Sequence, residues 1–457
     1  MRTSIAILAA GLGTRMKSKV AKVLHKAGGF TLVEHAVRAA LGVAQPEDIV
    51  AVVGHQAEAV KATLAPHGVA TALQSEQRGT GHALNMASPL LSSIPGRLVV
   101  LYGDVPLLSS GTVQRLVKEY DASGKGAVVI TCNLEDPTGY GRIVRGPNGD
   151  VAAIVEQKAA SADQLKIREI NSGIYCFNSE LLWKHIAEIG TNNPAGEYYL
   201  TDIVEIFNQK GYGVAPMVIE DFSELLGINT RLELAQVDEI FRKRKTRELM
   251  LDGVTIERPD TVTIDLDVRV GRDATLESGV RLLGTTVVGE DCVVGAGSVI
   301  SNSVLGDGVL VGAYTSIADS KVGAGAHVGP FARLRQNNDV GERAHIGNFV
   351  ELKKTQMGAG AKANHLAYLG DSSIGTKSNI GAGTITCNYD GVKKHKTVIG
   401  AHAFVGSNST LVAPIEIGDE AYVAAGSVIT DPVPNGALAL GRARQTVKQG
   451  WKPKSKR

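Results

Sequence analysis

The chain has 457 residues, of which 44% are hydrophobic and 21% are charged, and its formal net charge is +2 at pH 7. This length exceeds one ordinary core and predicts two or three domains. The near-neutral charge excludes the strongly basic class of proteins, so we expect no nucleic-acid partner and no membrane partner. The basic segment 452–457 is an exception, which we interpret as a solvated terminus.

Cysteine usage and hydropathy favour a cytoplasmic protein. Cys132, Cys176, Cys292 and Cys387 lie far apart, without the paired spacing of a zinc site. Unpaired cysteines are typical of a reducing compartment. The apolar stretch SIAILAA near the N-terminus is too short for a secretory signal and is interpreted as a first strand. No later stretch is long enough to span a membrane.

The first half of the chain alternates short aliphatic runs with helical patterns. The runs 5–10, 48–54, 97–104, 126–131 and 173–178 are predicted strands, and 31–41 and 111–120 are predicted helices. This alternation is typical of a Rossmann-like α/β domain whose largely parallel sheet has helices on both faces. Ligands of such sheets bind at the carboxyl ends of the strands.

The second half has a different period. Residues 229–250 contain no Gly or Pro and carry mixed charges, which predicts one long linker helix. After it, an aliphatic residue followed by glycine recurs every six residues, for example at Gly289 and Gly295 and at Gly306 and Gly312. A hexapeptide period predicts a parallel β-helix whose coils each have three sides. The predicted domains are therefore 1–228 and 251–457, joined by the helix 229–250.

A glycine turn follows the first predicted strand in the stretch LAAGLGTRM. Met16 stands where a dinucleotide fingerprint requires a third glycine, and no Gly-Lys-Ser/Thr triplet of a P-loop follows. Backbone N–H groups of such a turn can still face an anion, with Arg15 and Lys22 near enough to neutralise a polyphosphate. A surface turn with solvated basic residues is the alternative.

Two further segments strengthen the phosphate interpretation. A second glycine turn contains Gln74, Gly79 and Thr80, whose amide and hydroxyl groups suit a nucleotide base. Asp104 lies just past a predicted buried strand, where a carboxylate can hold Mg²⁺ against phosphate oxygens. A lone aspartate at a strand end is more often a turn or cap residue. Asp104 is a candidate metal ligand only because it occurs together with the two glycine turns.

The motifs LAAGLGTRM, QRGTGHA, YGD, TGYGRI, EIN, GEYYLTD and GIN follow one another along the chain. Together with the hexapeptide half, they resemble the bifunctional bacterial N-acetylglucosamine-1-phosphate uridyltransferases and glucosamine-1-phosphate acetyltransferases over nearly all residues. The resemblance implies a left-handed β-helix, Mg²⁺ as the metal, UTP and acetyl-CoA as co-substrates, and a homotrimer with acetyl-transfer sites between subunits. The implied reactions are acetylation of glucosamine 1-phosphate and then uridyl transfer to the N-acetylated sugar phosphate, which together make UDP-N-acetylglucosamine.

The resemblance also assigns residues to the first site. Those that contact the uridine nucleotide are Leu8, Ala9, Ala10, Gly11, Lys22, Gln74, Gly79, Thr80, Tyr102, Gly103 and Asp104. Gly141, Glu156 and Asn171 hold the sugar, while Asp104 and Asn229 bind magnesium. Arg15 and Lys22 offset phosphate charge during the displacement. Ala21 departs from the family, which usually has proline there, and we expect it to loosen the loop.

In the β-helix half, two cations stand where glycine is usual. Counting by six from Gly329 reaches Arg335, and later Lys353, one coil apart, so we expect the two side chains to stack. Such a pair needs an anion. Glu351 is one candidate, and a substrate phosphate is the other.

His365 follows a predicted corner in a position that elsewhere holds small or polar residues such as Asn348, Ala382 and Ser407. A histidine there is a candidate general base, although an isolated surface histidine is usually inert. The inserted segment 387–396 is either a decoration or a loop whose Lys393 or Lys394 meets coenzyme phosphates.

The resemblance completes the second site. It assigns the proton transfer to His365, and it assigns the sugar phosphate to Arg335, Lys353, Tyr368 and Asn379. The predicted acetyl-CoA contacts are Ala382, Asn388, Tyr389, Ser407, Ala425 and Arg442. Two alternatives stay open: a sugar-phosphate nucleotidyltransferase whose β-helix is a noncatalytic scaffold, and a different specificity such as adenylyl transfer to glucose phosphate. The charged residues at glycine positions argue against the first.

Overall fold

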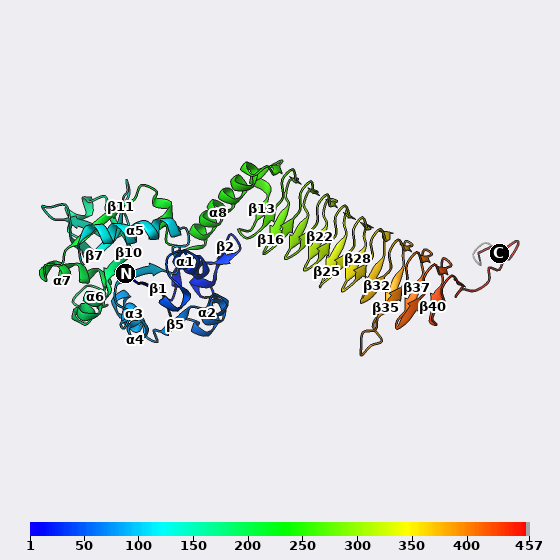
Figure 1. The fold of residues 1–457 in the computed structure, drawn as a ribbon, viewed down its shortest axis with the longest axis horizontal. Helices are drawn as coiled ribbons and strands as arrows, with labels where there is room; N and C mark the ends of the chain where they lie inside the picture. Colours follow the sequence, from blue (N-terminus) through cyan, green and yellow to red (C-terminus); the bar gives the residue numbers. More distant parts are fainter. Residues whose placement is uncertain (454–457) are drawn as a thin grey trace. The chain divides into compact units, whose positions relative to one another are not determined.

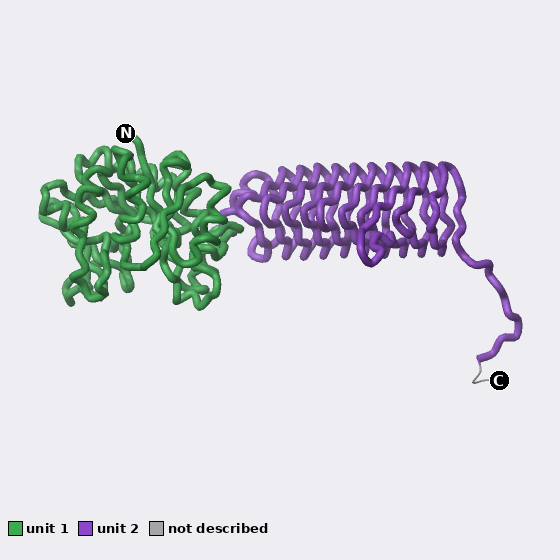
Figure 2. Tube along the Cα trace, turned by 90° about the horizontal axis from the view of Figure 1, so that it is seen from below, with its two compact units in different colours: residues 1–241 green, residues 242–457 purple. Residues whose placement is uncertain are grey.

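The computed structural model describes residues 1–453, so positions 454–457 of the predicted basic tail lie outside the described residues. Two compact units make up the chain, coloured separately in Figure 2: Met1–Phe241, and a second that begins at Arg242. Helix α8, Arg231–Leu251, contains the boundary and corresponds to the predicted long helix. Of the helices in the described part of the chain, none combines the length and apolar character of a membrane span.

The first unit is a twisted sheet with helices on both faces (Figure 1). Its strands are β1 Thr3–Ala9, β4 Ile49–Val53, β5 Ala70–Leu73, β6 Arg97–Tyr102, β7 Ala127–Asn133, β8 Arg142–Arg145, β9 Val151–Val155, β10 Glu169–Asn178 and β11 Val214–Val218, with a separate hairpin of β2 Lys26–Ala27 and β3 Phe30–Thr31. Its helices are α1 Leu32–Leu41, α2 Ala57–Leu64, α3 Thr80–Met86, α4 Ser88–Leu91, α5 Ser110–Ser123, α6 Ser179–His185 and α7 Ile203–Gln209.

The strand order β11-β7-β10-β6-β1-β4-β5 confirms the predicted α/β class. Strands β6, β1, β4 and β5 are parallel, whereas β10 runs antiparallel to both neighbours. Strand β1 shows why both faces are covered: Ile5 and Ile7 join one buried cluster with α1 and α5, and Ala6 and Leu8 join the other with α3 and α7. A strand buried on both faces needs a continuous apolar run, as this sequence has.

The second unit is a left-handed parallel β-helix, as predicted, with three parallel sheets as its sides. The first side comprises β12 Thr255–Ile256, β15 Thr275–Leu276, β18 Val293–Val294, β21 Leu310–Val311, β24 His327–Val328, β27 His345–Asn348, β30 Lys362–His365, β33 Asn379–Ile380, β36 Phe404–Val405, β39 Tyr422–Val423 and β41 Leu438–Ala439. The second comprises β13 Thr263–Ile264, β16 Arg281–Leu283, β19 Val299–Ser301, β22 Ser316–Ala318, β25 Arg333–Arg335, β28 Glu351–Lys353, β31 Tyr368–Gly370, β34 Ile385–Cys387, β37 Thr410–Val412 and β40 Val428–Ile429. The third comprises β14 Arg269–Val270, β17 Val287–Val288, β20 Val304–Leu305, β23 Lys321–Val322, β26 Asp339–Val340, β29 Gln356–Met357, β32 Ser372–Ile374, β35 Thr397–Ile399 and β38 Ile415–Ile417.

The hexapeptide pattern explains this shape. One aliphatic residue per side points inward, and these residues form a single buried column that includes Leu334, Ile346 and Leu352. The following glycine stands where the next coil comes close: a Cβ added at Gly341 would lie 2.5 Å from the backbone nitrogen of Ala359. Each coil is covered by its neighbours, so stacking supplies the stability that one coil lacks.

Candidate active sites

A cavity of about 260 Å³ lies at the carboxyl ends of β1, β5 and β6 in the first unit. Ten of the predicted nucleotide residues line it, namely Leu8, Ala9, Ala10, Gly11, Lys22, Gln74, Gly79, Thr80, Tyr102 and Asp104. Gly103 lies beside them, and its N–H donates to the Leu8 carbonyl at 2.9 Å. Gln77 and Glu197 also line the cavity and were not predicted as site residues, although they lie in the quoted motifs QRGTGHA and GEYYLTD.

Two glycines shape the walls of this cavity. Gly13 has φ 62°, and a Cβ there would lie 2.5 Å from the Cβ of Lys22. Gly79 has φ 112°, and a Cβ there would lie 2.5 Å from the Tyr198 carbonyl oxygen. Only glycine fits positions that combine positive φ with such close approach. The two turns therefore bring Lys22 and the start of α3 up to the cavity.

Lys22 joins the predicted magnesium ligands. Its ammonium pairs with the Asp104 carboxylate and lies 3.3 Å from Asn229 Oδ1, to which Arg15 Nη2 also donates at 2.8 Å. The Ile228 N–H donates to the Asp104 carbonyl at 2.9 Å, which fixes the two segments together. The structure therefore brings all four predicted side chains to one point.

These oxygens suit a magnesium ion. A carboxylate and an amide carbonyl already converge on one cation, the Lys22 ammonium, and both are hard oxygen ligands. Protein sites for Mg²⁺ commonly supply one or two such ligands and leave the rest to water and substrate phosphates. Residues 1–453 hold no cluster of three or more His, Cys, Asp or Glu side chains suited to a metal.

Asn229 lies outside the helix that it was expected to open. Helix α8 begins at Arg231, and Thr230 caps it, because Thr230 Oγ1 accepts from the Glu233 N–H at 3.2 Å while Glu233 accepts from the Thr230 N–H at 2.7 Å. This reciprocal arrangement is a capping box. The cap leaves Asn229 in the preceding loop, with its side chain free to face Asp104 and Lys22.

The predicted sugar residues form a group next to the cavity. The Asn171 N–H donates to the Gly141 carbonyl at 2.9 Å, and a Cβ at Gly141 would lie 3.5 Å from Glu156 Oε1. Burial raises the pKa of Glu156, and the nearby Asp202 carboxylate raises it further. Tyr102 lines the cavity, and burial, together with the charges of Asp104 and Glu156, raises the pKa of its hydroxyl. Glu156 is therefore close enough to Tyr102 to connect the sugar residues with the cavity.

Gln56 holds the loop at Ala21, the position where the resemblance led us to expect a looser loop. Its Oε1 accepts from the Ala21 N–H at 2.9 Å, and its Nε2 donates to the Lys19 carbonyl at 2.6 Å. Ala21 has φ −54°, a value that proline also adopts. The side chain of Gln56 therefore supplies an external restraint where a proline ring would supply an internal one.

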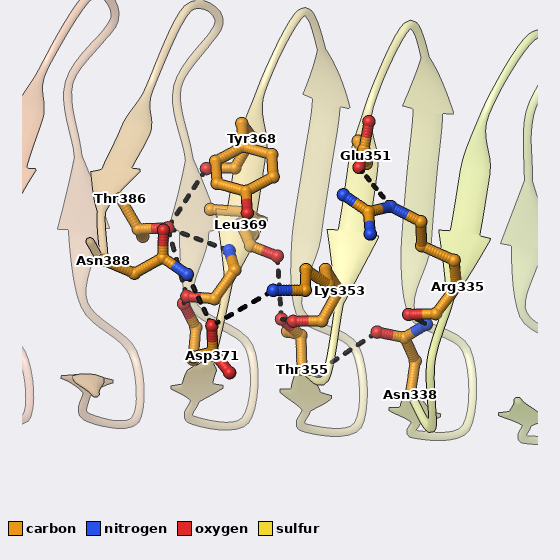
Figure 3. Close-up of polar contacts among 12 residues, drawn as sticks. Arg335, Asn338, Glu351, Lys353, Thr355, Tyr368, Leu369, Asp371, Thr386 and Asn388 are labelled. Atoms are coloured by element: carbon orange, nitrogen blue, oxygen red, sulfur yellow. Dashed lines mark hydrogen bonds and ion pairs between the residues drawn. The ribbon is translucent and has the colours of Figure 1, made fainter. Parts of the chain in front are cut away.

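In the second unit, the strand register pairs Arg335 with Lys353 in successive coils, as predicted, but their side chains point toward different anions (Figure 3). They do not share an anion. Glu351 Oε1 accepts from Arg335 Nε at 2.6 Å, whereas Lys353 Nζ lies 3.7 Å from Asp371 Oδ2. Lys353 is buried, so its charge is screened less than that of a surface lysine.

Tyr368 and Asn388 flank the same cations. Tyr368 stacks on Glu351 in the next coil, and Asn388 Nδ2 donates to Asp371 (Figure 3). The adjacent Lys353 ammonium lowers the pKa of Lys394, which places a third cation at this position. Three cations against the two carboxylates of Glu351 and Asp371 leave a positive balance here, which suits a phosphate group.

Lys394 belongs to the loop predicted at 387–396, which extends away from the coils next to β35 (Figure 1). Asp390 organises this loop: its carboxylate accepts from the N–H groups of Val392 and Lys393 and pairs with His395 at 2.6 Å. These contacts lower the pKa of Asp390. Tyr389, a predicted coenzyme contact, is 60% exposed in the same loop.

His365 lies at the end of β30, and it faces Asn348 one coil earlier. The distance from His365 Nδ1 to Asn348 Oδ1 is 2.7 Å. An amide oxygen can only accept, so Nδ1 carries the proton and Nε2 is left as the acceptor. Asn348 was not predicted as a site residue, although it occupies the same corner position as His365.

This corner continues through the predicted coenzyme residues. The register of β30 on β33 places His365 next to Ala382. The Asn408 N–H donates to the Ala382 carbonyl at 2.7 Å, the Gly426 N–H to the Ser407 carbonyl at 2.8 Å, and Arg442 Nη1 to the Ala425 carbonyl at 2.9 Å. One column, from Asn348 to Arg442, thus carries five of the predicted residues.

The structure does not join every predicted acetyl-transfer residue within one chain. His365 and Asn379 belong to the first side of the β-helix, whereas Arg335, Lys353 and Tyr368 belong to the second. His365 is the last residue of β30, where the first side ends, and Lys353 and Asp371 lie where the second side ends. The column and the cationic group therefore lie on different sides of the β-helix.

Comparisons with known proteins agree with both units. Residues 5–167 match the family model described as a MobA-like NTP transferase domain, residues 267–302 match bacterial transferase hexapeptide repeats, and residues 396–431 match the hexapeptide repeat of succinyl-transferase. The bifunctional GlmU protein of Solibacter usitatus is 55% identical over 99% of this chain and 97% of its own.

The chain belongs to the bifunctional GlmU family. The GlmU protein of Koribacter versatilis is 49% identical, over 99% of this chain and 97% of its own length. That of Shouchella clausii is 46% identical, over 97% of each chain. The description of these relatives as bifunctional disfavours the alternative of a noncatalytic β-helix scaffold.

The restraint by Gln56 can be tested by hydrogen exchange. In Gln56→Ala the Ala21 N–H loses its acceptor, so the amides of residues 18–22 should exchange about tenfold faster, the factor that corresponds to one lost hydrogen bond. Exchange measured by mass spectrometry checks this, with peptides from α1 as the internal control. Unchanged protection at residues 18–22 would show that Gln56 does not restrain the loop.

Proposed function

We propose that the protein makes UDP-N-acetylglucosamine in two steps, each at the site of one unit. The β-helix transfers the acetyl group from acetyl-CoA to glucosamine 1-phosphate, and the first unit then transfers the uridyl group from UTP to the product. Membership of the bifunctional family supports both activities. The observation that carries the assignment of sites is that ten predicted nucleotide residues line one cavity at the carboxyl ends of parallel strands.

In the uridyl-transfer step, a phosphate oxygen of N-acetylglucosamine 1-phosphate attacks the α-phosphorus of UTP. The bond to the β-phosphate oxygen breaks and pyrophosphate leaves. Arg15 and Lys22 offset the negative charge of the phosphates, and Gly141, Glu156 and Asn171 orient the sugar so that its phosphate faces the nucleotide. Positioning and charge stabilisation carry this reaction, without a covalent enzyme intermediate.

Asp104 and Asn229 are the residues that would hold magnesium. Bound there, the ion would neutralise phosphate charge and polarise the phosphoryl oxygens. The Lys22 ammonium that now joins these two oxygens is then available to the phosphates of the nucleotide.

Asp104→Ala should lower the rate of uridyl transfer by at least about 1,000-fold, because a magnesium ligand and the partner of Lys22 are lost together. Acetyl transfer should stay near the wild-type rate, and it should also survive EDTA. Steady-state assays of the two half-reactions measure this, with Asp163→Ala as the control, since Asp163 is an exposed aspartate of the same unit. An EDTA-sensitive acetyl transfer would contradict a magnesium site confined to the first unit.

In the acetyl-transfer step, the amine of glucosamine 1-phosphate attacks the thioester carbonyl of acetyl-CoA. The amide bond forms, the C–S bond breaks and coenzyme A leaves as the thiolate, which becomes the thiol when His365 passes on the proton that it took from the amine. His365 Nε2 accepts the amine proton, and Asn348 holds the ring by accepting from Nδ1. Arg335, Lys353 and Tyr368 bind the sugar phosphate with Asn379, while the column Ala382, Ser407, Ala425 and Arg442 binds acetyl-CoA with Asn388 and Tyr389.

His365→Ala should lower the acetyl-transfer rate by about 100- to 10,000-fold, the usual contribution of a general base, with little change in the apparent affinity for substrates. Uridyl transfer should stay near the wild-type rate. His402→Ala is the matched control, since His402 is another exposed histidine of the β-helix. A folded His365→Ala protein that acetylates at nearly the normal rate would exclude His365 as the base.

An exposed apolar ladder supports the proposal of a homotrimer. Tyr314, Phe331, Phe349 and Leu366 follow one another along one corner and are 49–63% exposed. The rings of Tyr314, Phe331 and Phe349 stack with centroids 5.5 Å apart. A contiguous exposed apolar surface of this kind marks a protein interface. Phe349 follows Asn348 and Leu366 follows His365, so a subunit docked on the ladder would also border the acetyl-transfer column.

The double variant Phe331→Glu/Phe349→Glu should shift the protein from trimer to monomer, because two charges would be buried in an apolar interface. Acetyl transfer should fall about 100-fold or more, while uridyl transfer persists. Analytical ultracentrifugation measures the mass. Val304→Glu, a charge placed on an exposed valine of another side, is the control. A double variant that stays trimeric would place the interface elsewhere.

A further inference from the structure

Gln74 is a buried residue at the edge of the nucleotide cavity. It follows β5 directly, it is 3% exposed, and its side chain contributes to the cavity wall. A buried primary amide has two N–H donors and one carbonyl acceptor to satisfy. Which end of this amide faces the cavity decides which base edge it can bind.

The contacts of Gln74 fix that orientation. Its Nε2 lies 3.2 Å from the Gly79 carbonyl and 2.9 Å from His82 Nδ1. A carbonyl oxygen only accepts, so the amide end that faces Gly79 is the NH₂ group. Both N–H groups are thereby engaged. Among residues 1–453 no group donates to Gln74 Oε1, which leaves that oxygen for a ligand of the cavity.

The second of these contacts defines the state of His82. Nδ1 accepts a hydrogen bond only when it is unprotonated, so the ring carries its proton on Nε2. Helix α3 holds the ring in place, because the neighbouring Gly81 N–H donates to the Tyr198 carbonyl at 2.8 Å. The rings of His82 and Tyr198 lie 6.3 Å apart. His82 lines a second cavity of about 260 Å³, together with Gly81 and Tyr198.

We propose that His82 is a positioning residue that sets the base specificity of the nucleotide cavity. It locks the Gln74 amide so that Oε1 accepts from the N3–H of uracil. Cytosine has an unprotonated N3, which Oε1 repels, and it could be bound there only if the amide turned its NH₂ group to the ligand. That rotation would set Oε1 against the Gly79 carbonyl oxygen, and it would require His82 to move its proton from Nε2 to Nδ1 before it could donate to Oε1. Two buried acceptors that face one another without a donor are costly. This inference rests on the proposed function, in which the cavity holds a uridine nucleotide.

Two substitutions of His82 test the proposal in the full-length protein. His82→Leu keeps bulk but removes the acceptor, whereas the Oδ1 of His82→Asn takes a position near that of Nδ1 and accepts the same hydrogen bond. We expect His82→Leu to weaken UTP binding about tenfold, the factor that corresponds to the loss of one hydrogen bond. It should also reduce the preference for UTP over CTP by at least about tenfold. His82→Asn should restore most of both.

Calorimetric Kd values for UTP and CTP provide the first measurement, and KM and kcat of uridyl transfer provide the second. The loss should be in KM with kcat little changed, because the amide of Gln74 binds the base and not the reacting phosphates. His67→Leu, remote from the cavity and paired with Glu34, is the control for a general effect of losing a histidine.

Three results would overturn the proposal: wild-type protein that binds CTP as tightly as UTP, a His82→Leu variant with an unchanged preference, or equal losses in His82→Leu and His82→Asn. The last would show that ring bulk matters and the acceptor does not. Failure of the proposed function is distinguishable from these, since it would appear as an absence of uridyl turnover in wild-type protein whatever its Kd values.

Discussion

Hydrogen bonding between successive parallel coils is the constraint on which the second unit depends. It places each corner residue against the residue one coil later, as for Arg335 on Lys353 and Asn348 on His365. Short sequence motifs are thereby converted into long linear features. One corner position becomes the column from Asn348 through His365 to Arg442, and the next becomes the apolar ladder from Tyr314 to Leu366.

In the first unit, the corresponding constraint is that charged and polar side chains meet at the carboxyl ends of the parallel strands. Its parallel strands end at one edge, so residues that are distant in sequence meet there without long loops. Lys22 illustrates the outcome, because one ammonium joins Asp104 from the end of β6 to Asn229 from the loop before α8. Gln56 and His82 do not line the cavity and act on it through a neighbouring residue. Each orients a neighbour, Ala21 or Gln74, through hydrogen bonds that fix backbone or amide direction.

Most of the fold could be predicted from sequence because it is periodic. Continuous apolar runs predicted β1, β4, β6 and β7, and the six-residue period predicted the three-sided coil and the pairing of Arg335 with Lys353 in successive coils. The partners of these residues could not be predicted in the same way. Whether Glu351 serves Arg335, Lys353 or both depends on side-chain rotamers, and the contact of Lys353 with Asp371 joins residues in different coils. Asn348 was visible as a corner residue, but its role required the measured approach to His365.

The central claim is that two independent sites, one in each unit of the protein, carry out successive reactions. Mixing tests it most directly. Asp104→Ala and His365→Ala proteins are combined with glucosamine 1-phosphate, acetyl-CoA and UTP, and the formation of UDP-N-acetylglucosamine is followed by chromatography. Each variant alone should form little product, whereas the mixture should form it readily, because N-acetylglucosamine 1-phosphate released by one protein is used by the other. A mixture no more active than either variant alone would contradict the account.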